Sequence, residues 1–320
     1  MRTGADPPWL SVTSGAERAR EAVSRTVAHG SGASVTAFAL EGGGSYGAAQ
    51  IGMLYALVEA GIEPDLVVGT SVGAMNGAMF AARLDARRAV EDLEHMWRRI
   101  RRRDVLPVRP VGAFGAILGR RAGLVPPDGL GRLIDRWLPV AQLQDLARPF
   151  AAVATDIVTG EPVVLREGPA RTALLASGAI PGLYAPVRID GHDLVDGGVV
   201  ANFPVDVAAG LGATRIYALP TAVSAPSRLS GPFALVQRAS DVLITRASRN
   251  ALASTATAAA VSELPAPVTD RSMFDFHGTG ELMDAGYEQT QRWLAGLPVD
   301  PVVGRRHASA SSAVPGFAYH

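Results

Sequence analysis

The 320-residue chain contains no cysteine, so it can form no disulfide, use no thiolate nucleophile and offer no thiolate ligand to a metal. It contains no lysine either. Its 30 arginines balance 30 acidic residues, and the net charge of zero gives no global field that would attract nucleic acid. The metal-binding patterns H-E-x-x-H and D-x-[DN]-x-[DN]-G are missing as well. We therefore expect no metal, no other cofactor and no nucleic-acid partner.

Long apolar runs are also missing, although 48% of the residues are hydrophobic. No stretch approaches the roughly 20 apolar residues that span a bilayer. The N-terminal region lacks the apolar core of a signal peptide. We expect a soluble, cytoplasmic protein, with contact to a membrane surface left open.

Apolar runs alternate between strand-like and helix-like patterns in the first third of the chain. Residues 35–41 and 65–70 predict strands, and each is followed by a predicted helix, at 48–61 and 72–84. Strands that are apolar along their whole length are typical of a parallel sheet covered on both faces. The pattern therefore predicts an α/β fold in three layers, with a mainly parallel central sheet.

The composition also suggests how the chain is divided. We expect a flexible extension at 1–33 and a flexible tail at 301–320, because both are polar and rich in small residues. The main domain is expected at 34–220, and a helical C-terminal part at 221–300 packs on it. Residues 96–126 hold an arginine cluster followed by Pro and Gly. They are interpreted as a solvated helix end with a connecting loop, or as a cap or lid that meets anionic lipid headgroups.

The first candidate motif is "GTSVG", Gly69–Gly73, which follows a predicted strand and opens a predicted helix. A G-x-S-x-G match alone is weak, and a turn would explain it. In this context it has the form of a nucleophile elbow, in which a tight bend exposes the hydroxyl of Ser71. Gly69 and Gly73 let the neighbouring backbone approach the serine.

The second motif is "GGGSYG", Gly42–Gly47, again between a strand and a helix. Three successive glycines leave bare backbone N–H groups at a helix N-terminus, which is an anion site. The anion could be the pyrophosphate of a dinucleotide or the oxyanion of an acyl-transfer intermediate. A dinucleotide fold normally ends its second strand with an acidic residue. Here that strand ends in Gly69, Thr70 and Ser71, which favours the oxyanion.

The third motif is "DGG", residues 196–198, after the apolar pair "LV". By itself it is typical of an Asp-Gly turn at a strand end.

In this order and spacing the three motifs resemble the patatin-like phospholipase family. The resemblance extends to "GLVPPDGLGRLI", "ATDIVTGE" and "ASGAIPGLYAPV", and so covers about residues 36–220. It implies a patatin-like α/β/α fold in the 34–220 domain. It also implies a hydrolase of lipid acyl esters, of phospholipase A or lysophospholipase type, whose partner is a lipid ester.

The resemblance also assigns roles to residues. It implies Ser71 as nucleophile and Asp196 as proton acceptor, and backbone N–H groups of Gly42, Gly43 and Gly44 as the oxyanion hole. The remaining motif positions are Gly47, Gly69, Gly73, Gly197 and Gly198. Because an aspartate is a weak base at its ordinary pKa, we expect Asp196 to be buried, with a raised pKa. Tyr46 stands where the family usually has Arg or Lys, which raises the question of how the glycine loop is anchored.

The sequence does not select a single mechanism. A Ser-His-Asp triad would need a late histidine, and His277 is the candidate. His192 lies near Asp196 and is interpreted as a surface turn residue. The motifs are equally compatible with acyl transfer to an acceptor other than water, with action on an ester that is not a phospholipid, and with an inactive binding protein on this scaffold.

Overall fold

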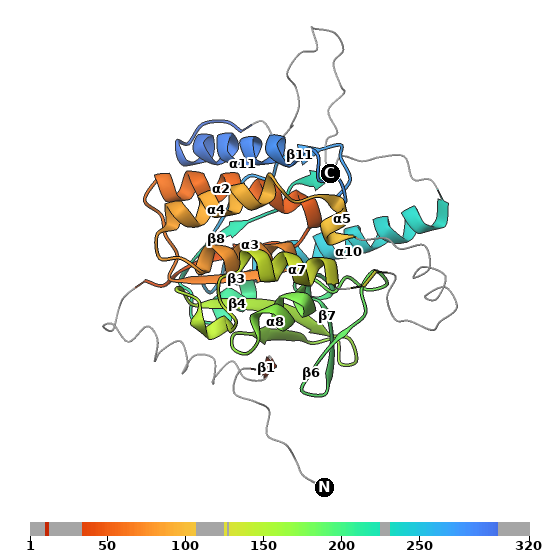
Figure 1. The fold of residues 1–320 in the computed structure, drawn as a ribbon. Coiled ribbons are helices and arrows are strands. Elements are labelled where there is room, and N and C mark those ends of the chain that lie inside the picture. The colour runs from red at the N-terminus through yellow and green to blue at the C-terminus, as the bar shows by residue number, and fades with distance from the viewer. Residues whose placement is uncertain (1–9, 13–33, 107–124, 127, 225–230, 300–320) are drawn as a thin grey trace.

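A computed structural model describes residues 10–12, 34–106, 125–126, 128–224 and 231–299 (Figure 1). Within these residues nine strands form one sheet, in the path β1-β5-β4-β3-β2-β8-β10, with β7 on β4 and β6 on β7. The bounds of these strands are β1 Leu10–Val12, β2 Thr36–Leu40, β3 Leu66–Thr70, β4 Phe150–Asp156, β5 Pro162–Leu165, β6 Val187–Ile189, β7 His192–Asp196, β8 Arg215–Leu219 and β10 Ala260–Glu263. The short strands β9 Val223–Ser224 and β11 Val268–Thr269 pair separately.

Helices cover both faces of this sheet. Their bounds are α2 Ala48–Glu59, α3 Val72–Ala81, α4 Ala86–Trp97, α5 Arg102–Val105, α7 Asp128–Trp137, α8 Ala170–Ser177, α9 Val205–Gly210, α10 Gly231–Thr255 and α11 Thr279–Leu294. Short 3-10 turns, η2 Gly44–Gly47, η3 Leu143–Asp145 and η4 Gly197–Val199, link some of the elements. None of the helices in the described ranges is long and apolar enough to cross a membrane.

The alternation of side chains along β2 shows how the layers form. Phe38 and Leu40 belong to the larger apolar cluster, under α2, α3, α4, α7, α8 and α11. Ala37 and Ala39 point to the opposite face and join the smaller cluster, which α9 and α10 cover. Because side chains alternate along a strand, a fully apolar strand is buried on both sides. The predicted three-layer fold with a mainly parallel sheet is confirmed.

The parallel part of the sheet is β4-β3-β2-β8-β10, and β5 and β7 lie antiparallel to β4. The predicted strands at 35–41 and 65–70 and the two helices that follow them are present within one to three residues of their expected ends. The prediction did not include β10, a parallel edge strand in the 221–300 part. Predictions for the arginine-rich segment fall mostly outside the described residues, since 107–124 is not described.

The two helices α2 and α11 lie side by side on the larger face (Figure 1). A Cβ on Gly52 of α2 would lie 1.9 Å from the carbonyl oxygen of Met283, and one on Gly286 of α11 would lie 2.1 Å from that of Ala49. The C-terminal part is therefore joined closely to the main domain.

Candidate active site

Ser71 lies at the junction of β3 and α3, with φ 55° and ψ −122°. Positive φ is rare for a residue with a side chain and marks a strained bend. A Cβ on Gly69 would lie 2.3 Å from the carbonyl oxygen of Gly73, and one on Gly73 would lie 2.3 Å from that of Leu40. The bend at Ser71 therefore requires glycine at both flanking positions.

A second serine holds this bend in place. The backbone N–H of Ser71 donates to Oγ of Ser177 at 2.9 Å, and the Ser177 hydroxyl donates to the carbonyl of Val153 at 2.6 Å. Ser177 is completely buried at the end of α8. Ser177 was not among the predicted site residues, although it lies in one of the stretches that carried the resemblance.

Asp196 is the last residue of β7, and the register of β4 brings it to Ser71. Thr70, at the end of β3, pairs with Val153 of β4, while Asp196 pairs with Ala154, the next residue. Because β3 and β7 run in opposite directions beside β4, their C-terminal ends meet. Ser71, which directly follows β3, and Asp196, which ends β7, are therefore neighbours.

The carboxylate of Asp196 accepts a hydrogen bond from the backbone N–H of Gly198 at 2.8 Å, and the Ser71 side chain lies close enough to this carboxylate to lower its pKa. Asp196 is 6% exposed. Burial raises its pKa from the ordinary value of 3.8 to about 6, and the effects of Ser71 and of the Gly198 N–H only partly oppose this. The expectation of a buried aspartate with a raised pKa is confirmed.

The glycine loop lies directly beside Ser71. A Cβ on Gly42 would lie 3.2 Å from Cβ of Ser71 and 2.5 Å from Oδ1 of Asn202. The N–H of Gly42 donates to the carbonyl oxygen of Asn202 at 3.0 Å. This bond already uses the N–H of Gly42, which counts against its predicted role as an oxyanion donor. The N–H groups of Gly43 and Gly44 have no acceptor within the described residues.

The other motif glycines also stand where a side chain would collide. A Cβ would lie 2.5 Å from Oγ1 of Thr221 at Gly43, 2.7 Å from the carbonyl oxygen of Met273 at Gly44, 2.7 Å from Cγ2 of Val72 at Gly47, 2.3 Å from the carbonyl oxygen of Val153 at Gly197 and 2.9 Å from Oδ1 of Asn202 at Gly198. Because these residues have no side chains, the backbones of the glycine loop and of the loop after Asp196 can lie close to the groups around them.

Tyr46 supplies an anchor for the glycine loop. Its hydroxyl donates to the carbonyl oxygen of Arg271 at 2.5 Å. The neighbouring N–H of Ser45 donates to the carbonyl oxygen of Met273 at 2.8 Å. The glycine loop is thus anchored to residues 271–273 of the C-terminal part, through Tyr46 and Ser45 and without a basic side chain at position 46.

A buried glutamate, which the sequence analysis did not identify, links the same loops. Glu41 accepts hydrogen bonds from Nδ2 of Asn202 and the N–H of Thr221, both at 3.1 Å, and from the hydroxyl of Ser248 at 3.4 Å. Burial raises its pKa to about 7, although these three donors oppose the shift. The glycine loop, the loop after Asp196 and α10 therefore meet at one carboxyl group.

In the described part of the chain, no hydrogen bond joins a histidine to Ser71 or Asp196. His277 is 86% exposed and its Nδ1 lies 3.0 Å from Asp275. His192 begins β7, and its half-buried ring lies 2.7 Å from Asp156, so its interpretation as a turn residue is wrong. The described ranges hold no cluster of three acidic or histidine side chains that could bind a metal ion.

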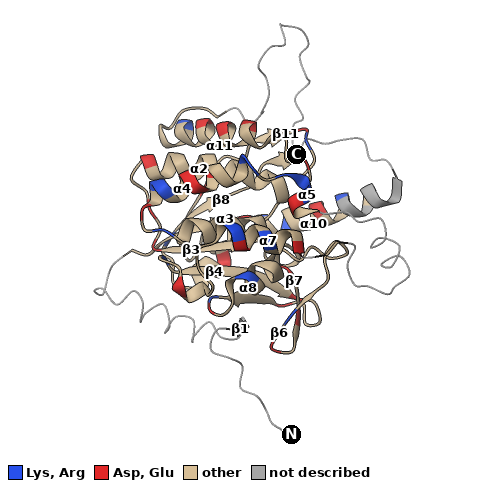
Figure 2. Ribbon diagram, viewed as in Figure 1, with Lys and Arg blue, Asp and Glu red and all other residues tan. Residues whose placement is uncertain are grey.

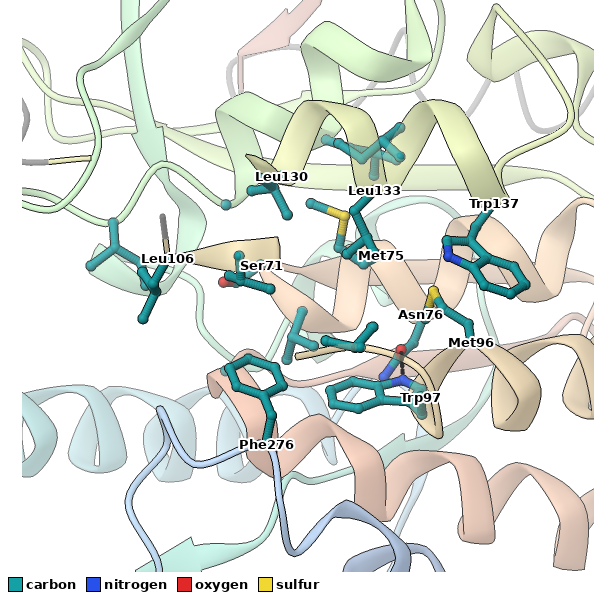
Figure 3. Close-up of a pocket in the computed structure, with 18 of the residues that line it drawn as sticks. Ser71, Met75, Asn76, Met96, Trp97, Leu106, Leu130, Leu133, Trp137 and Phe276 are labelled. Atoms are coloured by element: carbon teal, nitrogen blue, oxygen red, sulfur yellow. Dashed lines mark hydrogen bonds between the residues drawn. The ribbon is translucent and has the colours of Figure 1, made fainter. Parts of the chain in front are cut away.

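An apolar pocket opens at Ser71 and extends between α3, α4, α7 and α8 (Figure 3). Met75 and Met79 follow Ser71 along α3 at four-residue intervals, so the pocket runs about 12 Å beside that helix. Its far walls include Trp97 and Trp137. The indole N–H of Trp97 donates to Asn76 at 2.9 Å, which satisfies the polar groups of this wall. The pocket therefore presents an apolar channel to one side of the serine hydroxyl.

Comparison with known proteins places this geometry in a family. A sequence model described as patatin-like phospholipase matches residues 38–209, more than half of the chain. The matched range contains Ser71, Asp196 and all three glycine motifs.

Curated relatives are similar over the same part of the chain. A 194-residue region is 34% identical to patatin-like phospholipase domain-containing protein 7 of Rattus norvegicus, covering 57% of this chain and 13% of that protein. A 206-residue region is 34% identical to an uncharacterized NTE family protein of Mycobacterium tuberculosis, covering 63% of this chain and 52% of that protein. The chain therefore matches about half of one relative and a small part of the other.

Among solved structures, VipD from Legionella pneumophila aligns with a TM-score of 0.45 at 16% identity, covering 82% of this chain and 67% of that chain.

Proposed function

The chain belongs to the patatin-like phospholipase family, and from this premise we propose that it hydrolyses lipid acyl esters with Ser71 as nucleophile and Asp196 as base. The observation that carries the proposal is that the sheet register brings Ser71 and the buried Asp196 together, with Ser71 lining an apolar pocket. A nucleophile and a base within hydrogen-bond reach are the minimum for acyl transfer through a covalent intermediate.

In the first half-reaction, Oγ of Ser71 attacks the ester carbonyl while Asp196 accepts the hydroxyl proton. The carbonyl oxygen becomes an oxyanion, and the N–H groups of Gly43 and Gly44 are the available donors for it. The loss of one such donor typically lowers the rate about 10²–10³-fold. Protonated Asp196 then gives its proton to the leaving alcohol, and the acyl group stays on Ser71.

In the second half-reaction, water attacks the acyl-enzyme and Asp196 accepts a proton from that water. The tetrahedral intermediate collapses, the fatty acid leaves and Ser71 regains its proton. The pKa of Asp196, raised to about 6 by burial, suits both directions of transfer near neutral pH. The acyl chain of the substrate occupies the apolar pocket throughout.

A fluorophosphonate probe, which reacts with an activated serine, tests the assignment. The full chain and its Ser71→Ala, Asp196→Asn and His277→Ala variants are labelled and compared. We expect no labelling of Ser71→Ala, much slower labelling of Asp196→Asn and wild-type labelling of His277→Ala, which serves as the exposed control.

Other outcomes would contradict the proposal in different ways. Loss of labelling in His277→Ala would indicate a histidine-dependent triad. If the folded wild-type chain is not labelled, the chain is a binding protein on this scaffold. Product analysis with an added alcohol acceptor separates hydrolysis from acyl transfer, because both begin from the same acyl-enzyme.

A further inference from the structure

A series of hydrogen bonds joins the wall of the apolar pocket to the glycine loop. The indole N–H of Trp97 donates to Oδ1 of Asn76 at 2.9 Å, as the dashed line in Figure 3 shows. Nδ2 of Asn76 donates to Oε1 of Gln50 at 2.9 Å and to the carbonyl oxygen of Gly47 at 3.0 Å. Nε2 of Gln50 donates to the carbonyl oxygen of Glu41 at 2.9 Å. We call the side chains of Trp97, Asn76 and Gln50 the buried relay.

The three side chains of the relay are buried and use all of their N–H groups. Gln50 and Asn76 are completely buried, and Trp97 is 2% exposed. The second hydrogen of Gln50 Nε2 goes to the carbonyl oxygen of Leu219 at 3.0 Å. Because an indole can only donate, Trp97 requires Oδ1 of Asn76 to face it, and Asn76 in turn requires Oε1 of Gln50. The orientations of the two amides are therefore linked to the position of the indole.

The relay connects the helix that carries the nucleophile to both ends of the glycine loop. Asn76 lies on α3, which begins directly after Ser71. The two loop carbonyl groups that the relay binds, those of Glu41 and Gly47, stand on either side of the proposed oxyanion donors. Such donors act only within about 2.7–3.1 Å of the oxyanion, so a small shift of the loop lowers their effect. The relay therefore sets the position of the donors relative to the serine.

The relay is built from neutral groups. It consists of an indole, two amides and the backbone carbonyl groups that they bind. Of the two helices that carry the amides, α3 has no charged residue and α2 has only Glu59, at its C-terminal end (Figure 2). An effect of the relay on the rate is therefore expected to be the same at pH 6 and pH 8, unlike the titration of Asp196.

An acyl chain on Ser71 reaches Trp97 if the chain is long enough. Asn76, the partner of Trp97, is five residues after Ser71 on α3, about 7.5 Å along the helix axis. Carbon–carbon bonds of about 1.5 Å lengthen an extended chain by roughly 1.3 Å each, so an octanoyl chain spans about 9 Å, whereas an acetyl group ends beside the serine. The ring of Trp97 lines the pocket and stacks on Phe276 with centroids 6.3 Å apart. A medium-length chain therefore fills the space beside the indole.

We propose that the acyl chain of the substrate positions the oxyanion donors through the buried relay, which makes Asn76 and Gln50 positioning residues and favours esters whose acyl chain reaches Trp97. The proposal rests on the proposed function for its ester. Packing of the chain against Trp97 keeps the indole N–H on Asn76, and the two amides keep the glycine loop in place. Part of the binding energy of the chain thereby accelerates the reaction instead of tightening binding.

The test compares kcat for p-nitrophenyl octanoate and p-nitrophenyl acetate in the full chain. Trp97→Phe removes the indole N–H and keeps an aromatic ring in the pocket wall. We expect the wild-type kcat to be about tenfold higher for the octanoyl ester, and Trp97→Phe to lose this ratio while its kcat for the acetyl ester stays within about threefold. Both half-reactions form an oxyanion, so kcat reports the donors whichever half-reaction is slower.

Two further variants separate the relay from the pocket wall. Trp137→Phe makes the same truncation in the same pocket but outside the relay, and it should change KM for the octanoyl ester while the kcat ratio persists. Asn76→Leu should lower kcat for both esters about 10–100-fold, because the loop loses its link to α3.

Three results would overturn the proposal. Trp97→Phe could change only KM, it could lower kcat equally for both esters, or a folded Asn76→Leu variant could keep the wild-type kcat. The comparison of Trp97→Phe with Trp137→Phe decides the proposal even if Asn76→Leu does not fold.

A measurement without catalysis keeps this result separate from the proposed function. In the Ser71→Ala background, hydrogen–deuterium exchange of a peptide containing residues 42–47 is followed with octanoate or acetate present. Octanoate should slow this exchange about 3–10-fold, acetate should leave it unchanged, and Trp97→Phe should remove the difference. If the wild type hydrolyses neither ester while this difference remains, the proposed function fails and the relay stands. If the difference is absent, the relay fails even in an active enzyme.

Discussion

Two aspartates at the ends of paired strands have opposite electrostatic properties. Asp156 ends β4 and is 4% exposed, and Asp196 ends β7 and is 6% exposed. Burial acts to raise the pKa of both carboxyl groups. The outcome differs because Asp196 lies deeper in the protein and loses more hydration, and because Asp156 has more hydrogen-bond donors.

Asp156 accepts three hydrogen bonds. His192 lies 2.7 Å from its carboxylate, and the N–H groups of Val158 and Thr159 donate to it at 2.8 and 3.3 Å. Burial raises the pKa of Asp156, but these donors outweigh it and hold the pKa below the ordinary value. This carboxylate stabilises a turn and the start of β7.

Within the described residues, the one hydrogen bond to the Asp196 carboxylate comes from the N–H of Gly198; Ser71 also lowers the pKa, but burial prevails and the pKa rises to about 6. The comparison teaches that burial alone does not make a carboxylate basic. A buried aspartate becomes a proton acceptor where its donors are too few to compensate for the lost hydration.

The largest expected difference between the two aspartates is in reactivity. Asp196→Asn should slow fluorophosphonate labelling of Ser71 about 10²–10⁴-fold, because the base is lost. Asp156→Asn should leave the labelling rate within a few-fold. Both rates are measured on variants whose folding is checked by circular dichroism. Equal rates in the two variants would show that Asp196 is not the base.

The pH dependence of labelling sharpens the comparison. Only ionised Asp196 accepts a proton, so the labelling rate of the wild type should rise with pH through about 6 and be about tenfold lower at pH 5 than at its plateau. Glu41, with a pKa of about 7, is the other buried carboxyl group near the site. If the Glu41→Gln variant keeps the inflection near pH 6, the inflection belongs to Asp196. If the variant loses the inflection, the inflection belongs to Glu41.

Stability should change in opposite directions at the two aspartates. The raised pKa of Asp196 favours the folded state while the group is protonated, and this contribution is lost as pH rises through about 6. At pH 8 the Asp196→Asn variant should therefore be more stable than the wild type by about 1–3 kcal/mol. The gain should disappear near pH 4, where the aspartic acid is itself neutral.

At Asp156 the lowered pKa favours the ionised form, so its contribution is present above the ordinary pKa and is lost as pH falls through the folded value. Asp156→Asn should lower the free energy of unfolding at pH 8 by about 1–3 kcal/mol, since it weakens charged hydrogen bonds. Urea denaturation of both variants at two pH values measures these effects. Changes of the same sign in both would contradict the comparison.

The smallest change in stability is expected for His192→Gln. This variant tests whether His192 has a structural or a catalytic role. His192→Gln removes the imidazole partner of Asp156 and should lower stability by about 1 kcal/mol at neutral pH. Fluorophosphonate labelling should be unchanged within about twofold, because His192 bonds Asp156 and not Asp196. A large loss of labelling would indicate that His192 takes part in catalysis.

The sequence allowed the fold class and the tight bend at Ser71 to be predicted because both depend on local patterns. Fully apolar strands followed by helices indicate a parallel sheet covered on both faces. The glycines at positions 69 and 73 indicate a bend that accommodates a strained serine, and the structure has that bend with φ 55° at Ser71.

Other features had no local signal. The strand β10 pairs with β8 through long-range contacts that a short, weakly apolar segment does not reveal. Ser177 and Asn202 are ordinary polar residues in the sequence, and only packing makes them the partners of Ser71 and Gly42. Nor does the sequence show that the carbonyl oxygen of Asn202 accepts a hydrogen bond from the N–H of Gly42.

By itself, then, the sequence determined the alternation of strands and helices in the first third of the chain, the positions of the tight bends and the serine that one of them presents. The tertiary structure decided which side chains meet. Ser71 and Asp196 are brought together because β3 and β7 end beside adjacent residues of β4, a register set by the packing of the whole sheet. It also decided the proton affinity of Asp196, since a pKa depends on burial and on the number of donors that the fold places around the carboxylate.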